Sequence, residues 1–454
     1  MAMHDPVRQL LALGDDPAMV FRGLGLSYAD LHALVQAQDA FLTEHGLTPG
    51  SVVALRGDFS PLTIALLLAL FEQRAVVALI PAGPADAEAL CAQVGARALI
   101  EVNDETATCR LLTPRGPHHP LLAGLLQEEK AGFVIFTSGS SGTPKPVLHG
   151  LDRFLKKYRT GGKAFSTLSF LLLDHIAGLD TLFYILYSGG VLVAPQERSP
   201  DHICRLIESA KVQVLPVSPS FVNLLWLSGD FERHDLSSVE IVTCGSEPMN
   251  ANVLDHVAIM FPNATIKQKY GTSEFGSPAS QSRGDDQRWI RLDGAGFETK
   301  VVDGILYVKS ETTMLGYLDD SAPAVADGWT NTGDRVEQDG PWLRILGRDS
   351  DIINVGGEKV FPGEVESVIG QVDEVAECLV YGEPNPITGS MVCATVLPRG
   401  DVDQKALRKA IKKLCGTRMS RYKVPVKITF SEDSLTNARQ KKVRRAAGQA
   451  PGGG

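Results

Sequence analysis

Residues 136–146 read FTSGSSGTPKP and follow the apolar run GFVIF at 132–136, which predicts a buried strand. Glycines let backbone N–H groups approach an anion, hydroxyl groups add hydrogen-bond donors, and Lys145 adds a positive charge. The stretch therefore predicts a phosphate-binding loop; the alternative is a Ser/Gly-rich loop without a ligand. It differs from the common phosphate loop in which lysine directly follows the last glycine, because Lys145 lies three residues beyond Gly142.

Helical stretches alternate with short apolar strands on both sides of this loop. Residues 62–71 predict a buried helix, and residues 75–80 predict a buried strand. Further strands of the same kind are expected at 132–136, 190–194, 212–217 and 241–244. Because such alternation is typical of parallel sheets covered by helices, we expect an α/β fold.

The pattern of the sequence changes near residue 296. Strands at 297–303, 305–309 and 342–346 alternate apolar and polar residues, which predicts half-exposed antiparallel strands. A polar break at 347–351 follows, and then helices are expected at 363–370 and 404–414 and strands at 375–381 and 391–397. We therefore expect a large N-terminal domain, residues 1–348, of parallel-rich α/β sheets with a small antiparallel β subdomain. A small mobile α+β C-terminal domain is expected over residues 349–454.

The composition is that of an ordinary globular protein, with 454 residues of which 44% are hydrophobic and 21% charged. The formal net charge of −9 argues against a nucleic-acid partner, and the longest apolar run is too short to span a bilayer. The seven cysteines form no CxxC pair, which indicates reduced thiols in the cytoplasm and disfavours zinc. Residues 405–445 carry 14 Lys and Arg against two acids, which indicates a solvated face or a surface for phosphates or an acidic partner.

The loop at 136–146 resembles the ATP phosphate loop of the adenylate-forming superfamily, which comprises acyl- and aryl-CoA synthetases, standalone adenylation domains and luciferases. Ser141 replaces the usual threonine, and Pro146 replaces the usual final glycine and so removes an N–H donor. The resemblance implies that the phosphates of ATP are bound by Thr137, Ser138, Gly139, Ser140, Ser141, Gly142 and Lys145. It also implies that Thr137 lies beside a Mg²⁺ ion.

Two further motifs resemble the adenine-binding segments of this superfamily. Residues 270–274 read YGTSE, and the resemblance places Tyr270 over adenine and Glu274 beside Mg²⁺. An aromatic ring can stack on a purine, and a carboxylate suits a hard cation that it shares with phosphate. The remaining residues that the resemblance assigns to the nucleotide are Gly271, Thr272, Ser273, Gly245, Ser246, Glu247 and Pro248. Taken alone, each motif would indicate only a turn before a helix.

Motifs on both sides of the predicted domain boundary continue the resemblance. Asp334, in TGD at 332–334, matches the aspartate that holds the ribose hydroxyls, and Arg348 matches an arginine that contacts ribose or phosphate. The hinge residue of the superfamily, usually Asp or Lys, is Ser350 in this chain. Gly356 and Gly357 resemble the loop that comes to line the thiol-acceptor tunnel after the C-terminal domain rotates.

The catalytic lysine implied by the resemblance falls within TNARQKKVRR at residues 436–445. Counting from Asn437 favours Lys441, whereas matching the apolar residue after the lysine to Val443 gives Lys442. His175 matches a position in the carboxylate pocket of the superfamily, which implies a gate or a carboxylate contact. The alternative for His175 is an ordinary core or surface histidine.

The resemblance implies an enzyme that uses ATP to convert a carboxylic acid into an acyl-adenylate and then transfers the acyl group to a thiol. The neutral pocket candidates, among them Ser218, Phe221 and Cys244, favour an aryl or medium acyl acid over an amino acid. Coenzyme A is the expected thiol. The alternatives are the phosphopantetheine of an acyl carrier protein and a non-catalytic nucleotide- or acyl-binding homologue. A monomer or homodimer in the cytoplasm is expected.

Overall fold

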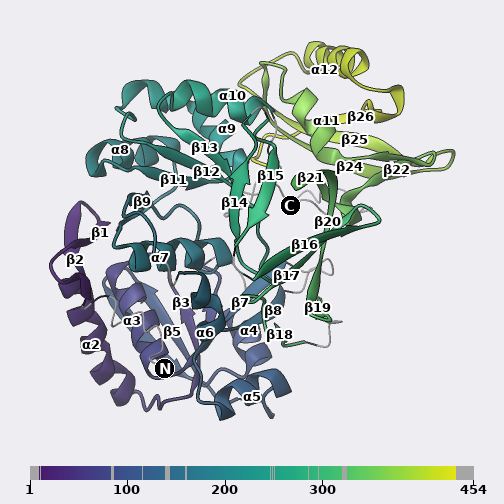
Figure 1. Cartoon of the computed structure of the whole chain (residues 1–454). Helices are drawn as coiled ribbons and strands as arrows, with labels where there is room; N and C mark the ends of the chain where they lie inside the picture. The colour runs from purple at the N-terminus through teal and green to yellow at the C-terminus, as the bar shows by residue number, and fades with distance from the viewer. Residues whose placement is uncertain are drawn as a thin grey trace.

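The structure is a computed structural model that describes residues 10, 12–82, 86–114, 116–138, 144–158, 161–245, 247, 249, 251–284, 286–294, 296–319 and 325–435. Within these residues the chain forms four β-sheets. The first two sheets and their helices occupy the lower and left parts of Figure 1, the third stands in the middle, and the fourth carries the last helices (Figure 1).

The first sheet has the strand order β18-β8-β7-β4-β3-β5-β6. Its strands are β3 (Val52–Arg56), β4 (Val76–Ile80), β5 (Ala98–Asn103), β6 (Thr106–Leu111), β7 (Gly132–Ser138), β8 (Pro144–Gly150) and β18 (Gly316–Tyr317). The central strands β3, β4, β5 and β7 run parallel, and the strands at both edges are antiparallel. The helices of this part are α2 (Tyr28–Glu44), α3 (Pro61–Glu72), α4 (Ala87–Val94) and α5 (Pro120–Gln127).

Helix α3 is the most deeply buried helix of this part, because its sequence is apolar on every side. All residues from Thr63 to Phe71 are buried, in a cluster that also includes α2 and α7 (Ile176–Ser188). Ser60 caps the helix by accepting a hydrogen bond from the N–H of Thr63, and Pro61 occupies the first turn. The helix expected at 62–71 and the strand expected at 75–80 are thus confirmed.

The second sheet has the strand order β13-β12-β11-β9-β10-β1-β2. Its strands are β1 (Pro17–Phe21), β2 (Leu24–Ser27), β9 (Ser166–Leu168), β10 (Val191–Ala194), β11 (Val214–Val217), β12 (Ile241–Cys244) and β13 (Thr265–Gln268). All neighbours are parallel except β1 and β2, and Met19 of β1 pairs with Leu192 of β10. The associated helices are α8 (Pro200–Ala210), α9 (Pro219–Ser228), η2 (Asp230–Arg233) and α10 (Ala251–Met260). The short helices α6 (Leu151–Phe154) and η1 (Leu155–Tyr158) follow β8 of the first sheet and pack in the cluster of α3 and α7.

The third sheet is antiparallel throughout. Its strands are β14 (Ala279–Ser282), β15 (Trp289–Asp293), β16 (Phe297–Val302), β17 (Ile305–Ser310), β19 (Val325–Ala326), β20 (Trp329–Asp339) and β21 (Trp342–Arg348). Strand β20 was not expected from the sequence. It holds Gly333 at a φ of +68° and shifts register on both neighbours, so its turn-like residues form irregularities within a long strand.

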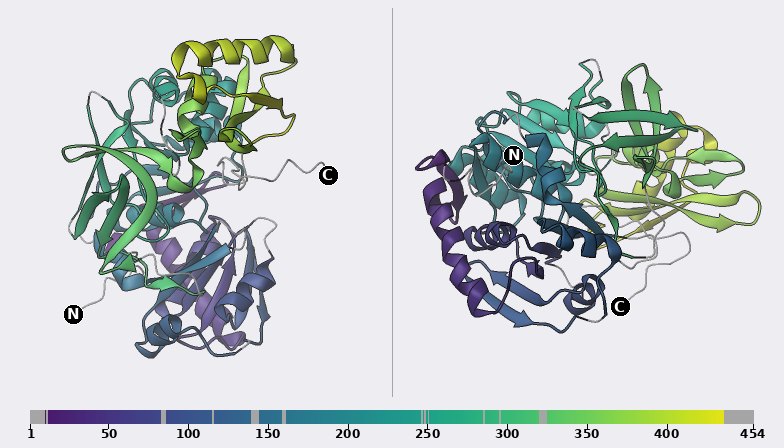
Figure 2. Two further views of the ribbon diagram at one scale, coloured as in Figure 1. Left: turned by 90° about the vertical axis from the view of Figure 1, so that its right-hand side faces the viewer. Right: turned by 60° about the horizontal axis from the view of Figure 1, so that its bottom comes forward.

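The fourth sheet follows the short helix η3 (Asp349–Asp351), at the polar break seen in the sequence. It consists of β22 (Ile353–Val355), β23 (Glu358–Val360), β24 (Val375–Asn385), β25 (Gly389–Pro398) and β26 (Lys427–Phe430), with α11 (Pro362–Ile369), α12 (Gln404–Arg418) and η4 (Arg421–Lys423). These elements form one core of their own and lie at one end of the molecule in both views of Figure 2. The expected α/β fold with an antiparallel β part and an α+β C-terminal part is confirmed.

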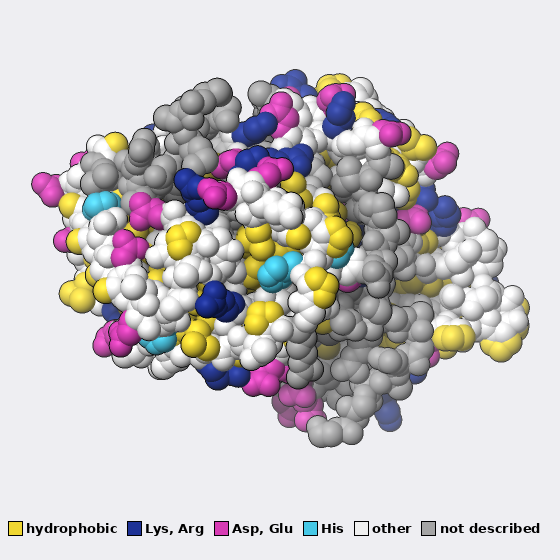
Figure 3. All heavy atoms as spheres, turned by 90° about the horizontal axis from the view of Figure 1, so that it is seen from below, with side chains coloured by type: hydrophobic (Ala, Val, Ile, Leu, Met, Phe, Trp, Pro, Cys, Tyr) yellow, Lys and Arg dark blue, Asp and Glu magenta, His cyan; other side chains and the backbone are white. Residues whose placement is uncertain are grey.

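None of the helices in the described ranges is both long and apolar enough to cross a membrane. On the face seen from below, Lys and Arg side chains are interspersed with Asp and Glu (Figure 3). Such mixing keeps the electrostatic field over the described part of this face weak.

Candidate active site

The strands β7 and β8 form a hairpin that brackets the predicted phosphate loop. Thr137 lies opposite Lys145 and Ser138 lies opposite Pro144, so the hairpin brings the first threonine and the lysine of the motif together at the end where the predicted loop joins its strands. Pro146 is buried within β8, where its carbonyl accepts a hydrogen bond of 2.9 Å from the N–H of Leu318. Four predicted loop residues, Gly139, Ser140, Ser141 and Gly142, lie outside the described residues.

Tyr317 links the lysine of this hairpin to Glu274. Its hydroxyl donates a hydrogen bond of 2.6 Å to Oε1 of Glu274, and the Lys145 ammonium lies 5.5 Å from its ring centroid. Tyr317 reaches this place because β18 pairs with β8, with Tyr317 opposite Val147. Tyr317 could not be predicted from the sequence, because it is separated by more than 40 residues from Glu274 and carries no motif of its own.

His149 contacts the backbone of the residue that precedes Glu274. Its Nε2 lies 2.7 Å from the carbonyl oxygen of Ser273, and its ring stacks on Phe133 with centroids 4.9 Å apart. Burial lowers the pKa of His149 to about 4, so the ring is neutral at pH 7 and Nε2–H donates to Ser273. A buried neutral histidine thus fixes the backbone next to Glu274.

His149 gives the stability of the fold a defined pH dependence. The unfolded histidine has a pKa near 6.5, so the unfolded chain binds an extra proton as pH falls from 6.5 to about 4. The stabilisation is complete above pH 6.5, and about 3 kcal/mol is lost by pH 4. His149→Gln keeps an N–H donor for Ser273 and does not titrate. Urea unfolding should therefore show the stability difference between the two proteins shrinking on acidification; parallel pH profiles would contradict the assignment.

The residues 270–276 form a tight turn that positions Tyr270 and Glu274. Thr272 and Gly276 exchange two backbone hydrogen bonds, of 3.1 and 2.9 Å. Gly271 allows the turn to close, because a Cβ atom there would lie 2.4 Å from the carbonyl oxygen of Gly276. The backbone of Glu274 also accepts a hydrogen bond of 2.6 Å from the N–H of Met314. The turn is therefore held from both sides.

Asp334 lies between Tyr270 and Arg348. The Tyr270 hydroxyl donates a hydrogen bond of 2.7 Å to one carboxylate oxygen, and Nε of Arg348 lies 3.0 Å from the other. Asp334 and Arg348 are paired across β20 and β21, and Arg348 also donates to the carbonyl oxygen of Thr332 at 2.7 Å. Burial raises the pKa of Asp334, against the opposing effect of Arg348. The group combines an aromatic ring, an acceptor and a cation, as a nucleoside site requires.

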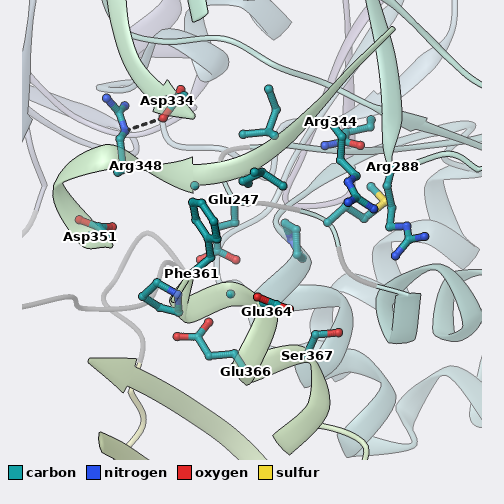
Figure 4. Close-up of a pocket in the computed structure, with 18 of the residues that line it drawn as sticks. Glu247, Arg288, Asp334, Arg344, Arg348, Asp351, Phe361, Glu364, Glu366 and Ser367 are labelled. Carbon is teal, nitrogen blue, oxygen red and sulfur yellow. Dashed lines mark ion pairs between the residues drawn. The ribbon is translucent and has the colours of Figure 1, made fainter. Parts of the chain in front are cut away.

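A cavity of about 710 Å³ opens beside this group. Arg344 and Arg348 of strand β21 lie on one side of the cavity, and Phe361, Glu364 and Ser367, at and within α11, lie on the other (Figure 4). Nδ2 of Asn252 in α10 donates a hydrogen bond of 3.5 Å to the carbonyl oxygen of Ser367. The predicted site residues that line the cavity are Glu247, Tyr270, Gly271, Asp334 and Arg348.

Other predicted site residues are placed elsewhere. His175 caps α7, where its Nδ1 accepts a hydrogen bond of 3.3 Å from the N–H of Ala177. Gly356 and Gly357 form an exposed turn between β22 and β23, with φ of +62° and +92°. Their predicted roles stay predictions. Ser246, Pro248, Lys441 and Lys442 lie outside the described residues.

Glu247 and Gly245 lie where β12 meets α9. The carboxylate of Glu247 accepts hydrogen bonds from the N–H and the hydroxyl of Ser220, at 3.2 and 2.7 Å. A side chain at Gly245 would come within 3.2 Å of the carbonyl oxygen of Lys269. The loop after β12 therefore packs directly against the residue that precedes Tyr270.

The described residues contain no group of three or more His, Cys, Asp or Glu side chains that could hold a metal ion. Magnesium commonly binds through one or two carboxylates while nucleotide phosphates and waters supply the other ligands. Glu274, with Thr137 at the end of the neighbouring hairpin strand, fits that pattern. The side chains present thus suit a Mg²⁺ ion carried by a nucleotide.

The sequence matches two family models. The model described as AMP-binding enzyme matches residues 8–318, and the model described as AMP-binding enzyme C-terminal domain matches residues 364–442.

Several curated proteins are similar over most of the chain. The 2-succinylbenzoate–CoA ligase of Listeria monocytogenes is 26% identical over 442 residues, covering 92% of each chain. The indoleacetate–CoA ligase of Aromatoleum aromaticum is 26% identical, covering 94% of this chain and 93% of the relative. The putative acyl–CoA ligase YdaB of Bacillus subtilis is 27% identical over 337 residues, which are 68% of this chain and 66% of that relative.

Two solved structures share the fold. The anthranilate CoA ligase AuaEII in complex with anthranoyl-AMP superposes with a TM-score of 0.83 at 20% identity, covering 97% of this chain and 96% of that chain. The o-succinylbenzoate CoA synthetase of Bacillus subtilis in complex with its acyl-adenylate gives a TM-score of 0.81 at 20% identity, covering 99% of both chains.

Proposed function

The chain belongs to the AMP-binding enzyme family, and we propose on this basis that it is an AMP-forming ligase that joins a carboxylic acid to a thiol. The acid attacks the α-phosphorus of ATP, which gives an acyl-adenylate and pyrophosphate. The thiol then attacks the acyl carbon, which gives the thioester and AMP. The CoA ligases that match over more than nine tenths of this chain support coenzyme A as the thiol.

The observation that carries this proposal is the set of contacts from Lys145 through Tyr317 to Glu274. In these contacts a cation and a carboxylate lie at the loop end of the hairpin that brackets the phosphate loop. The cation would neutralise phosphate charge, and the carboxylate would hold Mg²⁺ together with Thr137. When bound, the metal would withdraw charge from the phosphate oxygens as the acid attacks. The other phosphate contacts are assigned to Ser138, Gly139, Ser140, Ser141 and Gly142.

The nucleoside is assigned to the neighbouring group. Asp334 accepts hydrogen bonds from the ribose hydroxyls, Tyr270 offers its ring to adenine, and Arg348 fixes the carboxylate and adds positive charge. The adenine lies beside the loop of Gly245, Ser246, Glu247 and Pro248 and the turn of Gly271, Thr272 and Ser273. Positioning and charge neutralisation, without a covalent enzyme intermediate, then supply the rate.

The acid is aryl or medium acyl, with His175 as a gate or carboxylate contact. A carrier protein is the second candidate for the thiol, because α12 exposes a basic face of Lys405, Lys409, Lys412 and Lys413 that an acidic carrier could contact. Turnover with free coenzyme A alone would exclude a requirement for the carrier. A non-catalytic homologue would bind ATP without forming pyrophosphate.

The C-terminal domain is proposed to change its orientation during the reaction. We place the domain boundary between Arg348 and Asp349, with the domain 349–454 closing over the nucleotide and then rotating to bring Gly356 and Gly357 to the thiol. Lys441 or Lys442 stabilises the charge that develops on the reacting carboxylate and phosphate. The free state of all seven cysteines suits the cytoplasm, where a monomer or homodimer would act.

An ATP–pyrophosphate exchange assay over a panel of carboxylic acids tests this function. The wild type should exchange with one class of acid. One of the two single variants, Lys441→Ala or Lys442→Ala, should lower the exchange rate by about 10²-fold, because the charge that stabilises the transition state is lost. The other variant should keep the wild-type rate. Lys409→Ala, on the exposed face of α12, is the matched control and should not change the rate. No exchange with any acid despite measurable ATP binding would contradict the ligase assignment.

A further inference from the structure

The five cationic side chains that line the cavity differ in whether they form an ion pair with a carboxylate. Four of the five pair with carboxylates: Arg288 with Asp286 at 2.7 Å, Arg344 with Glu337 at 2.5 Å, Arg348 with Asp334 at 3.0 Å, and Lys423 with Glu364 at 2.7 Å. The fifth is Lys269. Within the described ranges, no hydrogen bond or ion pair satisfies its ammonium group.

The backbone places Lys269 at the edge of a parallel sheet. Its N–H donates a hydrogen bond of 2.7 Å to the carbonyl oxygen of Cys244, directly after β12 and β13 end side by side. Ligands of α/β proteins bind at this carboxyl edge of parallel strands. Pro219 and Asn223 of α9 and Met249, between β12 and α10, line the same cavity. Lys269 therefore stands where a substrate can reach it.

The surroundings of Lys269 carry an excess of positive charge. Burial lowers the pKa of Lys269, Asp180 opposes that effect, and Lys157 and Lys267 add to it. Asp180 is already engaged, because it forms an ion pair with Lys157 and accepts a hydrogen bond from the hydroxyl of Tyr158. An ammonium group that is half-buried beside other cations is stabilised when an anion binds to it.

The phosphates of ATP do not explain this cation. Their proposed binding residues, Thr137 and Lys145, lie at the end of the β7–β8 hairpin, and neither lines the cavity. The nucleoside group of Tyr270, Asp334 and Arg348 has its own cation. The remaining reactants are the acid and coenzyme A, and the hydrogen bond from the N–H of Lys269 to Cys244, a pocket candidate for the acid, favours the acid as the source of the anion.

We propose that Lys269 binds a second carboxylate of the acid substrate, at the end remote from the carboxylate that is activated. This inference rests on the proposed function. It narrows the proposed substrates from aryl or medium acyl acids in general to those that carry a second carboxylate. A charge-assisted hydrogen bond of this kind distinguishes a diacid from its monoamide, because the amide offers no negative charge to the ammonium group.

Matched pairs of acids test the proposal with the full-length protein. Linear and benzene dicarboxylic acids are compared with their monoamides by ATP–pyrophosphate exchange. At least one diacid should exceed its monoamide by about 30-fold in kcat/KM. Lys269→Met should remove most of that preference by raising the KM for the diacid, without changing the KM for ATP or the rate with the monoamide. Lys269→Arg should restore part of the preference, and Lys300→Met, on an exposed side chain of β16, should leave it unchanged.

Calorimetric binding of the same acids, with a non-hydrolysable ATP analogue, separates this inference from the proposed function. No exchange with any acid would contradict the ligase assignment. Even in that case, a diacid that binds to the wild type and binds more weakly to Lys269→Met would support the anion site. The proposal is overturned if the wild type binds diacid and monoamide equally, if Lys269→Met weakens both to the same extent, or if that variant raises the KM for ATP.

Discussion

Glu274→Gln should lower ATP–pyrophosphate exchange by about 10³-fold, or about 4 kcal/mol of transition-state stabilisation. The substitution keeps the size of the side chain and removes the negative charge that would hold Mg²⁺. Because Tyr317 donates to Oε1 at 2.6 Å, glutamine can still accept this hydrogen bond through its carbonyl oxygen. The fold should therefore survive, and the melting temperature of the variant should stay within a few degrees of the wild type.

Tyr317→Phe serves as the graded control for that result. It leaves the carboxylate in place and removes its single described hydroxyl donor, which should cost about tenfold in exchange rate. The exchange rate at rising Mg²⁺ concentration is the second readout, because a weakened metal site is rescued by more metal. Equal activity of Glu274→Gln and the wild type at all Mg²⁺ concentrations would remove Glu274 from the site.

Gly271→Ala should destabilise the protein by about 3 kcal/mol or more, because it forces an atom into occupied space. The added Cβ would lie 2.4 Å from the carbonyl oxygen of Gly276 and 2.9 Å from Cα of Ser277, and both are backbone atoms that cannot rotate away. The two hydrogen bonds between Thr272 and Gly276 would have to break. Any folded fraction should bind ATP poorly, since the same turn positions Tyr270 and Glu274.

Gly284→Ala is the matched control, because a Cβ there would meet nothing within 4 Å. Its urea unfolding midpoint should equal that of the wild type, whereas Gly271→Ala should unfold at a clearly lower concentration or fail to accumulate as folded protein. A wild-type midpoint for Gly271→Ala, with unchanged ATP affinity, would mean that the turn can open without loss.

The elements with strong local patterns could be predicted from the sequence. The apolar stretch 62–71 became α3, and the alternation at 305–309 and 342–346 became β17 and β21, because burial on one or both faces leaves a periodic trace. The sequence of strand β20 shows no such periodic pattern. Its Thr-Gly-Asp segment looks like a turn, and only the pairing with β17 and β21 holds the positive φ of Gly333 inside a strand.

Some residues of the candidate site could likewise be predicted from the sequence and others could not. Tyr270, Asp334 and Arg348 carry motifs of their own, and the structure brings them within hydrogen-bond distance. Tyr317 and His149 carry none, since their roles arise from partners on distant elements. Lys269 precedes a motif but belongs to none, and its lack of an ion pair among the described residues follows from three-dimensional neighbours that the sequence does not give.

The pairing of β1 with β10 has a consequence for how the chain is made. On the ribosome, Met19 emerges long before Leu192, its partner in the finished sheet. At about 5–20 residues per second, the first strand waits on the order of ten seconds or more for that partner, joined only to β2 in the meantime. During that time it presents an open edge to other nascent chains. The slow step of biogenesis should therefore be the capture of the N-terminal hairpin, which places the greatest need for chaperones midway through translation.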